Sequence, residues 1–510
     1  MSEIASNNKR IAKNTLLLYF RMFITMAIGL YTSRVVLNTL GISDYGIYNV
    51  VGGIITMLSF LNAGMVQSSQ RFISYELGRN NIGRLKEVFS TSVSIHVIIA
   101  IVAFILAETL GLWFVNTQLN IESDRMVAAN WVYQCSILTF MVNVVSVPYN
   151  SCIVAHEKMS AFAYISILEV ILKLVIVFLL LLSSYDKLIV YAVLVLLVSV
   201  LIRYCYTLYC KRNFVECIFR FSFDKSLFKE MFSFAGWSVI GSLGFSFKDQ
   251  ASNIILNIFY GTSLNAARGI GMQISNIVYT FSSNFSMALN PQITKQFAAG
   301  NKDESRKLVY AGSRYTFYLL TLITIPVIIN TEYILKLWLG VVPKYTSYFL
   351  IYSLITSLLY AVSGCVTTAI QATGKIKEFQ IGISFLMLLE LPVAYLLLYL
   401  NYPPYFVMYP SVVTYTVAIF FRFYLIKRMM LGYSFRYYIS NVLMPCLFIF
   451  SLSWIICYEI KGLFETSFFS LICVSFISMV IVSCMVFYLG MDALEREFAI
   501  KCVKKIIRCQ

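Results

Sequence analysis

Residues 167–182 read ILEVILKLVIVFLLLL, and residues 471–489 read LICVSFISMVIVSCMVFYL. A helix of about 20 such residues spans the ~30 Å hydrocarbon layer of a bilayer, because each helical residue rises 1.5 Å. In lipid the backbone must satisfy its own hydrogen bonds, so a spanning segment is a helix or part of a closed barrel, whose strands alternate apolar and polar residues. Neither stretch alternates, so both are predicted to be transmembrane helices.

Similar stretches recur along the whole chain of 510 residues. Hydrophobic residues make up 59% of the composition and charged residues 13%, against roughly 25% charged residues in soluble domains. We therefore predict an all-α polytopic membrane protein with about fourteen transmembrane helices. They cover residues 12–37, 45–66, 88–110, 126–149, 159–182, 187–209, 232–259, 264–289, 308–330, 345–369, 376–400, 405–426, 438–460 and 467–490. The second, seventh and eighth are weakly hydrophobic, as expected of helices that face a water-filled cavity.

Lysine and arginine gather in alternate gaps between these helices, with a ratio of about five to one between the two sets of gaps. Basic residues are retained in cytoplasmic loops, so both termini are predicted to be cytoplasmic. The same bias accounts for the net charge of +16, and nucleic acid is not an expected partner. The first apolar segment follows Lys9, Arg10 and Lys13. It is too long for a cleaved signal peptide and is expected to stay in the membrane as an anchor.

The twelve cysteines include no Cys-x-x-Cys pair, and the two histidines, His96 and His156, lie far apart. Most of the cysteines fall inside apolar stretches, where cysteine behaves as a small buried hydrophobe. No metal site and no cofactor are predicted. No gap is long enough for a soluble catalytic domain, so the chain is not expected to be an enzyme.

The two halves of the chain repeat at an offset of about 220 residues, with six predicted helices matching six in the same orientation. GIS at 41–43 corresponds to GTS at 261–263, GRN at 78–80 to GNK at 300–302, and AHEK at 155–158 to ATGK at 372–375. The predicted domains are an N-terminal lobe (1–210), a cytoplasmic amphipathic linker (211–231), a C-terminal lobe (232–430), and a last helix pair with a basic tail (431–510). Repeats of this kind place a transport site between the lobes.

Three motifs carry a resemblance to a known family. KNT at 13–15, GISDYGIYN at 41–49 and QSSQRFI at 67–73 resemble Wzx-type polysaccharide flippases, relatives of the MATE multidrug exporters in the MOP superfamily. The resemblance covers nearly the whole chain. It implies a flippase for undecaprenyl-pyrophosphate-linked oligosaccharide in the bacterial cytoplasmic (inner) membrane, serving O-antigen, lipopolysaccharide or capsule synthesis beside other polysaccharide assembly proteins. It also implies that the first, second, seventh and eighth helices line a central cavity.

Cations within the predicted helices are the candidate ligands for a pyrophosphate group. Placing a charged side chain at mid-bilayer costs at least about 2.5–3.5 kcal/mol of insertion free energy, so each such residue is expected to have a function or a partner that offsets the cost. Guanidinium forms forked hydrogen bonds to phosphate oxygens. The candidates for the substrate-binding cavity are Arg21, Arg34, Lys248, Arg268 and Arg314. Arg34, Arg203 and Arg422 lie near span ends, where snorkelling to the lipid headgroups is the simpler interpretation.

Carboxylates in the predicted helices divide into two kinds. Glu390 lies two residues before Pro392 with no cation within four positions. It either pairs with an arginine from another helix or is protonated. A protonatable carboxylate there can couple transport to a proton or sodium gradient, and Asp249 is the second candidate for coupling. Glu169 and Lys173 have the i, i+4 spacing of a structural ion pair.

Two other functions are weighed against the flippase. A MATE-like cation-coupled multidrug exporter needs acidic cavity residues, and only Asp44 and Asp249 are available on the cavity helices. A membrane polymerase or acyltransferase needs a large outer loop or a histidine-based constellation, and the sequence offers neither.

Overall fold

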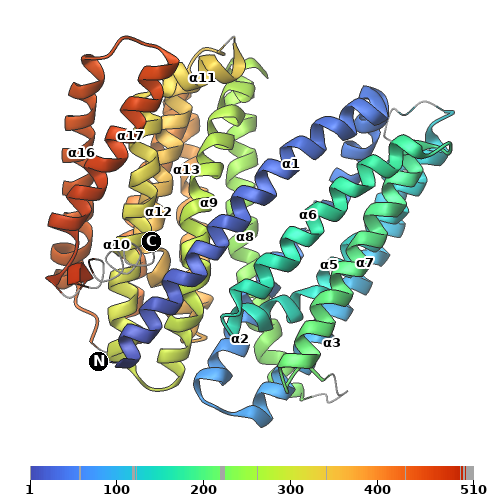
Figure 1. Cartoon of the computed structure of the whole chain (residues 1–510), viewed down its shortest axis with the longest axis horizontal. Helices are drawn as coiled ribbons and strands as arrows, with labels where there is room; N and C mark the ends of the chain where they lie inside the picture. The colour runs from blue at the N-terminus through green and yellow to red at the C-terminus, as the bar shows by residue number, and fades with distance from the viewer. Residues whose placement is uncertain are drawn as a thin grey trace, which may run out of the picture. The chain divides into compact units, whose positions relative to one another are not determined.

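The computed structural model describes residues 2–56, 59–117, 121, 123–218, 224–260, 262–340, 342–430, 432–493, 495–497 and 500. Every regular element within these ranges is a helix (Figure 1). The chain forms two compact units. Unit 1 comprises residues 1–243, 287–301 and 376–381, and unit 2 comprises residues 244–286, 302–375 and 382–510.

Unit 1 is a helical bundle in which α5 packs against α7, α2 and α3, while α1 packs against α6. Its core includes Phe89 of α3 and Tyr149 of α5, whose rings meet edge to face at 5.3 Å. The helices are α1 (Ser2–Thr56), α2 (Ser59–Gly78), α3 (Ile82–Leu106), η1 (Ala107–Gly111), α4 (Leu112–Thr117), α5 (Met126–Ala155), α6 (Met159–Leu182) and α7 (Lys187–Asn213).

Gly41 divides α1 into two helical segments, because its φ of 83° and ψ of 169° are not helical. A positive φ costs glycine little, since it has no Cβ. The break falls in the predicted gap between the first two spans. The predicted second span, 45–66, falls on the part of α1 that follows Gly41 and on the start of α2 (Ser59–Gly78), with residues 57 and 58 outside the described residues.

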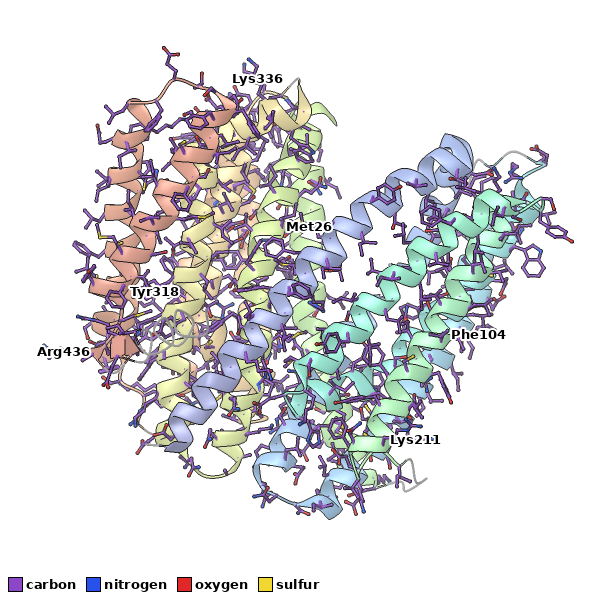
Figure 2. The ribbon with its side chains drawn as sticks, in the orientation of Figure 1. Met26, Phe104, Lys211, Tyr318, Lys336 and Arg436 are labelled. Atoms are coloured by element: carbon purple, nitrogen blue, oxygen red, sulfur yellow. The ribbon has the colours of Figure 1, made fainter. Side chains whose placement is uncertain are left out.

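Unit 2 is built around α12, which packs against α10 and α14, and α16 and α17 pack against α10. Figure 2 shows Lys336 and Arg436 at opposite ends of its helices. Its helices are α10 (Lys302–Ile329), α11 (Thr331–Leu339), α12 (Thr346–Ala372), α13 (Lys377–Tyr399), η2 (Pro404–Met408), α14 (Tyr409–Met429), α15 (Phe435–Tyr438), η3 (Ile439–Leu443), α16 (Met444–Gly462), α17 (Phe468–Met485) and η4 (Val486–Gly490). Three helices contribute residues to both units: α13, whose first residues belong to unit 1, and two further helices, α8 (Lys225–Tyr260) and α9 (Thr262–Ala298).

Ten helices in the described part of the chain are long and apolar enough to cross a membrane. They match the predicted third to sixth and ninth to fourteenth spans. Large apolar side chains cover their outer faces: Leu182 is 84% exposed and Phe476 68% exposed, as expected where lipid is the solvent. The remaining long helices, α1, α2, α8 and α9, contain the four spans predicted to line a cavity. The chain is a multi-pass membrane protein, and the count of fourteen spans stays a prediction.

The internal repeat reappears in the backbone. Asn80 (φ 54°) and Gly300 (φ 84°) are left-handed residues in the turns that precede α3 and α10. Glu157 (φ 60°) and Gly374 (φ 78°) are left-handed in the turns that precede α6 and α13. Asn80, rather than Gly78, therefore occupies the place of Gly300, which shifts the predicted alignment by two residues. Both halves bend the chain in the same way at the same points.

Candidate functional site: a charged interior in unit 2

Lys248 and Asp249 are neighbours on α8 whose side chains leave the helix in different directions. Successive helical residues are about 100° apart around the axis, so adjacent side chains reach different partners. Lys248 reaches Glu390 of α13, and Asp249 reaches Arg268 of α9. In the structure, each of the two has an opposite charge from another helix.

Arg268 is 2% exposed and is bound to two residues of α8. Its Nη2 donates to Asp249 Oδ1 at 2.6 Å, and its Nη1 donates to Asn253 Oδ1. Asp249 and Asn253 are spaced i, i+4 and therefore share one helix face. In this conformation the guanidinium is committed to them, so a contact between Arg268 and pyrophosphate requires the Asp249 pair to open.

Glu390 is buried in unit 2 at 3% exposure. The hydroxyl of Ser411 on α14 donates to Oε2 at 2.5 Å, and Lys248 Nζ lies 3.6 Å from the same oxygen. Lys248 Nζ also lies 5.4 Å from the ring centre of Tyr415. The other carboxylate oxygen, Oε1, is buried without a hydrogen-bond partner among the described residues. The partner of Glu390 is thus a lysine and not the expected arginine. Its second carboxylate oxygen remains able to accept a proton or to coordinate a cation.

Arg422 of α14 corrects the snorkelling interpretation. It lies inside unit 2, 2% exposed, with Nη1 donating to Ser363 Oγ at 2.6 Å. Its guanidinium lies 5.3 Å from the ring centre of Tyr360, whose edge meets the ring of Tyr415. The span estimate placed Arg422 four residues from a helix end, and only its packing against α12 shows that it stays inside.

The described interior of α8, α9, α13 and α14 thus holds more positive than negative charge. The cations are Lys248, Arg268 and Arg422, and the carboxylates are Asp249 and Glu390. Tyrosine rings and hydroxyls connect the two ends of this set, from Lys248 through Tyr415 and Tyr360 to Arg422. We call these five charged residues the unit 2 charge network. An apolar protein interior keeps such groups only where they are paired or have a function.

The other predicted site residues lie elsewhere. Arg314 of α10 is held by two carboxylates that follow α17, with Nη2 at 2.9 Å from Glu495 Oε1 and 3.2 Å from Asp492 Oδ2. Arg21 of α1 lies in unit 1, its guanidinium 4.9 Å from the ring centre of Phe162. The Arg34 side chain lies outside the described residues.

The predicted structural pair of α6 is formed. Lys173 Nζ donates to Glu169 Oε1 at 2.6 Å. The residues that the sequence analysis missed are Ser411, Ser363 and Arg422. No local pattern marks the two serines, because each becomes a partner only through packing between helices.

Comparison with known proteins identifies families to which the sequence is similar. A family model described as polysaccharide biosynthesis protein matches residues 11–297, more than half of the chain, and a MatE model matches residues 238–396. No curated protein matches the sequence significantly.

Several solved structures share the fold. One is an outward-facing multidrug resistance MATE family transporter of the MOP superfamily (TM-score 0.70, 14% identity, 83% of this chain and 96% of that chain). Another is a MOP superfamily transporter from Pyrococcus furiosus, described as having a binding pocket of reverse polarity (TM-score 0.65, 15% identity, 83% and 96%). The MATE transporter ClbM in complex with Rb⁺ is also similar (TM-score 0.67, 15% identity, 84% and 96%). The chain therefore belongs to the polysaccharide biosynthesis protein family and shares its fold with MATE transporters.

Proposed function

We propose that this chain is a flippase that moves a polyprenyl-pyrophosphate-linked oligosaccharide from the cytoplasmic to the outer leaflet of the bacterial cytoplasmic membrane. The cargo would supply O-antigen, lipopolysaccharide or capsule assembly. The observation that carries the proposal is the cation excess of the unit 2 charge network in a protein of this family. Ammonium and guanidinium groups bind phosphate oxygens through charge-assisted hydrogen bonds. For the similar transporter from Pyrococcus furiosus, the reverse polarity of the binding pocket is itself described as suggesting a different function.

In this proposal the cargo competes with the internal carboxylates. The pyrophosphate displaces Glu390 from Lys248 and Asp249 from Arg268, in a cycle of alternating access. After the cargo leaves on the outer side, Glu390 or Asp249 can bind a proton or a sodium ion there and carry it inward as the empty site returns. Support for this role comes from the Glu390 oxygen that lacks a hydrogen-bond partner. Arg21, Arg34 and Arg314 remain proposed cargo contacts at other stages of the cycle.

The membrane potential can supply the driving force. Moving one negative charge outward across an inside-negative membrane gains about 2.3 kcal/mol per 100 mV. We expect depolarisation to slow flipping of a labelled polyprenyl-pyrophosphate sugar in vesicles that contain the purified protein. Transport that ignores both voltage and ion gradients would contradict this mechanism.

Complementation tests the function and the site together. In the host lacking the native chain, Lys248→Met and Arg268→Ala should accumulate lipid-linked glycan in the cytoplasmic leaflet and lower surface polysaccharide at least about tenfold, the loss of about one charge-assisted contact. Lys307→Ala is the matched control, because that lysine is a basic residue of unit 2 whose side chain is 69% exposed. Immunoblots of the membrane fraction verify equal abundance. Normal surface polysaccharide in both interior variants would overturn the site assignment.

Glu390→Gln separates coupling from binding. The amide keeps a hydrogen bond with Ser411 but cannot take up a proton at membrane depth. We expect flipping by this variant to continue without responding to an imposed pH or sodium gradient. A gradient response equal to that of the unmodified protein would remove Glu390 from the coupling step.

The MatE match over residues 238–396 favours one alternative, a cation-coupled multidrug exporter. The cation excess of the charge network argues against it, because cationic drugs require acidic partners. Ethidium efflux from cells that express the chain, with no change in lipid-linked glycan, would select the exporter.

A further inference from the structure

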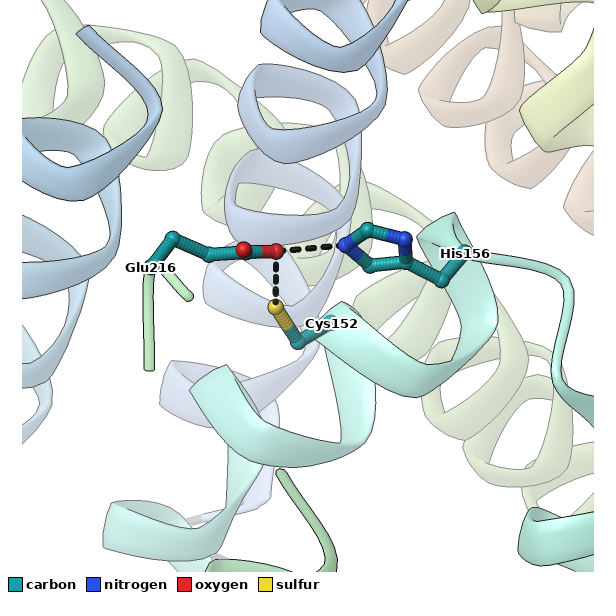
Figure 3. Close-up of side chains that lie close together, drawn as sticks. All are labelled: Cys152, His156 and Glu216. Carbon is teal, nitrogen blue, oxygen red and sulfur yellow. Dashed lines mark hydrogen bonds and ion pairs between the residues drawn. The ribbon is translucent and has the colours of Figure 1, made fainter. Parts of the chain in front are cut away.

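A second cluster of reactive side chains lies in unit 1, far in sequence from the charge network. Cys152 and His156 belong to the last turn of α5, and Glu216 lies in the loop that follows α7. One donor atom from each of the three lies within 4.8 Å of the other two (Figure 3). We propose that this cluster binds a zinc ion, with the thiol of Cys217 as the fourth ligand.

The donor spacing suits a tetrahedral zinc site. Zinc bonds of about 2.0–2.3 Å place tetrahedral donor atoms roughly 3.3–3.8 Å apart. Cys152 Sγ lies 3.5 Å from Glu216 Oε1, and Cys217 Sγ lies 3.4 Å from Cys152 Sγ. His156 Nε2 and Glu216 Oε1 lie 2.5 Å apart, so a metal ion needs this one pair to separate by about 1 Å. A small side-chain rotation supplies that movement.

The donor types favour zinc over other common ions. Two thiols, an imidazole and a carboxylate form a mixed sulfur, nitrogen and oxygen set, whereas calcium and magnesium take oxygen ligands. Cys152 and Cys217 are fully buried, and Glu216 is 3% exposed. The side chain of His156 is 24% exposed and gives the ion an entry path. The predicted topology puts this end of α5 in the cytoplasm, where thiols stay reduced.

The surroundings hold the ligands in place, as second-shell groups do in zinc proteins. The imidazole of His156 stacks on the Phe214 ring, with centroids 4.1 Å apart and planes within 9°. The amide of His156 donates to the Cys152 carbonyl at 2.9 Å, which fixes the last turn of α5. Cys210 of α7 donates from Sγ to the Tyr149 carbonyl at 3.5 Å. A bound ion would therefore fasten the end of α5 to the loop that leaves α7.

Spacing rules cannot find this cluster. The histidine and the glutamate are 60 residues apart, and the cysteines that join them lack any Cys-x-x-Cys motif. The prediction of no metal site rested on the separation of these residues in sequence. The packing of α5 against α7 brings them together in space.

The test measures metal content directly. The full-length chain, purified in detergent with a histidine-free tag, is equilibrated with Zn²⁺, desalted and analysed by elemental mass spectrometry. We expect about one zinc per chain, and at least a tenfold weaker affinity after Glu216→Gln or His156→Gln. Cys365→Ser is the matched control, because it changes a buried cysteine of unit 2 and should leave the zinc content unchanged.

Glu216→Gln separates a metal ligand from a merely structural carboxylate, because the amide can still accept a hydrogen bond from His156. Chelation should lower the thermal unfolding midpoint of the unmodified protein and leave that of Glu216→Gln unchanged. Loading with Co²⁺ should give the intense visible bands of a tetrahedral site with thiolate ligands. Absence of zinc in the loaded protein, full zinc content in both ligand variants, or a Cys152–Cys217 disulfide in protein kept under reducing conditions would overturn the proposal. None of these readouts depends on flippase activity.

Discussion

Three ion pairs of unit 1 contrast with one pair of unit 2. The three join helix ends: Arg125 binds Asp44 at 2.5 Å and Asp186 at 2.6 Å, and Arg84 binds Asp224 at 2.7 Å. These side chains are between 19% and 33% exposed. In unit 2 the Lys248–Glu390 pair lies inside the helices, with side-chain exposures of 8% and 3%.

The difference in burial changes what each ion pair contributes to stability. A solvent-exposed pair contributes about 0–1 kcal/mol and tolerates loss. A buried pair gains little net stability over apolar residues of the same size, yet loss of one partner leaves an uncompensated charge. A stabilising role therefore accounts for these three pairs of unit 1, whereas the buried pair of unit 2 is the one for which we propose a role in transport.

The largest predicted effect is the loss of one buried partner. Glu390→Ala should lower the free energy of unfolding by about 3–5 kcal/mol, because Lys248 then stays buried without its carboxylate. Glu87→Ala, which removes a helix-end partner of Arg84 in unit 1, should cost about 0–1 kcal/mol. Denaturant titration in mixed micelles measures both. Equal losses of stability in Glu390→Ala and Glu87→Ala would contradict the predicted difference between a buried and an exposed ion pair.

A double substitution sharpens this result. Lys248→Met with Glu390→Leu should restore most of the stability lost in Glu390→Ala, since apolar residues replace the buried pair. Flipping by the same protein should stay as low as that expected of Lys248→Met. Recovery of transport together with stability would show that the pair serves the fold alone.

A smaller effect concerns close helix packing, which both units use. A Cβ at Gly271 of α9 would lie 2.7 Å from the Leu350 amide nitrogen, and one at Gly78 of α2 would lie 2.4 Å from the Lys295 carbonyl oxygen. Gly271→Ala and Gly78→Ala should each cost about 1–3 kcal/mol. Gly269, two residues away on α9, has open space around its Cβ position.

Gly269→Ala is therefore the matched control for Gly271→Ala. It should raise the free energy of unfolding by up to about 1 kcal/mol through helix propensity. The same denaturant titrations compare the two variants. A loss in Gly269→Ala as large as in Gly271→Ala would contradict the close approach of α9 to α12.

The smallest predicted effect is a pH-dependent contribution of Asp186, in unit 1, to the free energy of unfolding. Burial acts to raise the pKa of Asp186, but hydrogen bonds from Arg125 and from the amides of Ile189 and Leu188 hold that pKa below its usual range. The lowered pKa adds stability that is present above the unfolded value of about 3.9 and is lost as pH falls through the folded value. Asp186→Asn keeps the cap on α7 and should cost about 1 kcal/mol at pH 7.

That cost should shrink as the pH falls below about 4, since the unmodified protein then loses the same charge. Unfolding midpoints across this pH range provide the measurement. The control is Asp124→Asn, a neighbouring exposed carboxylate, which should change little at any pH. A pH-independent difference for Asp186→Asn would mean that the charge contributes nothing.

Much of the fold could be predicted from hydrophobic length alone. The stretch at 167–182 forms most of α6. The predicted span, 159–182, has the same start and end as this helix. Helix ends were less predictable where polar residues continue a helix beyond its apolar part. α8 starts at Lys225, after Asp224 accepts from the amides of Ser226 and Leu227, and α9 continues through Pro291 to Ala298.

The site was predictable only in part. Lys248, Arg268, Asp249 and Glu390 draw attention because charges are rare inside spans. Their pairing could not be predicted, because it depends on which faces of α8, α9 and α13 pack together. The same limit explains Arg422, whose position near a predicted span end suggested the wrong environment.

The two left-handed turns at Glu157 and Gly374 share a backbone bend but differ in chemistry. Glu157 accepts from Lys295 at 2.6 Å and from Gln292, and the Asn14 amide donates to its carbonyl at 3.1 Å. Its counterpart is a glycine, which adopts the same bend without strain. The same bend therefore carries a buried charged anchor to α1 and α9 in one half of the chain and a glycine in the other.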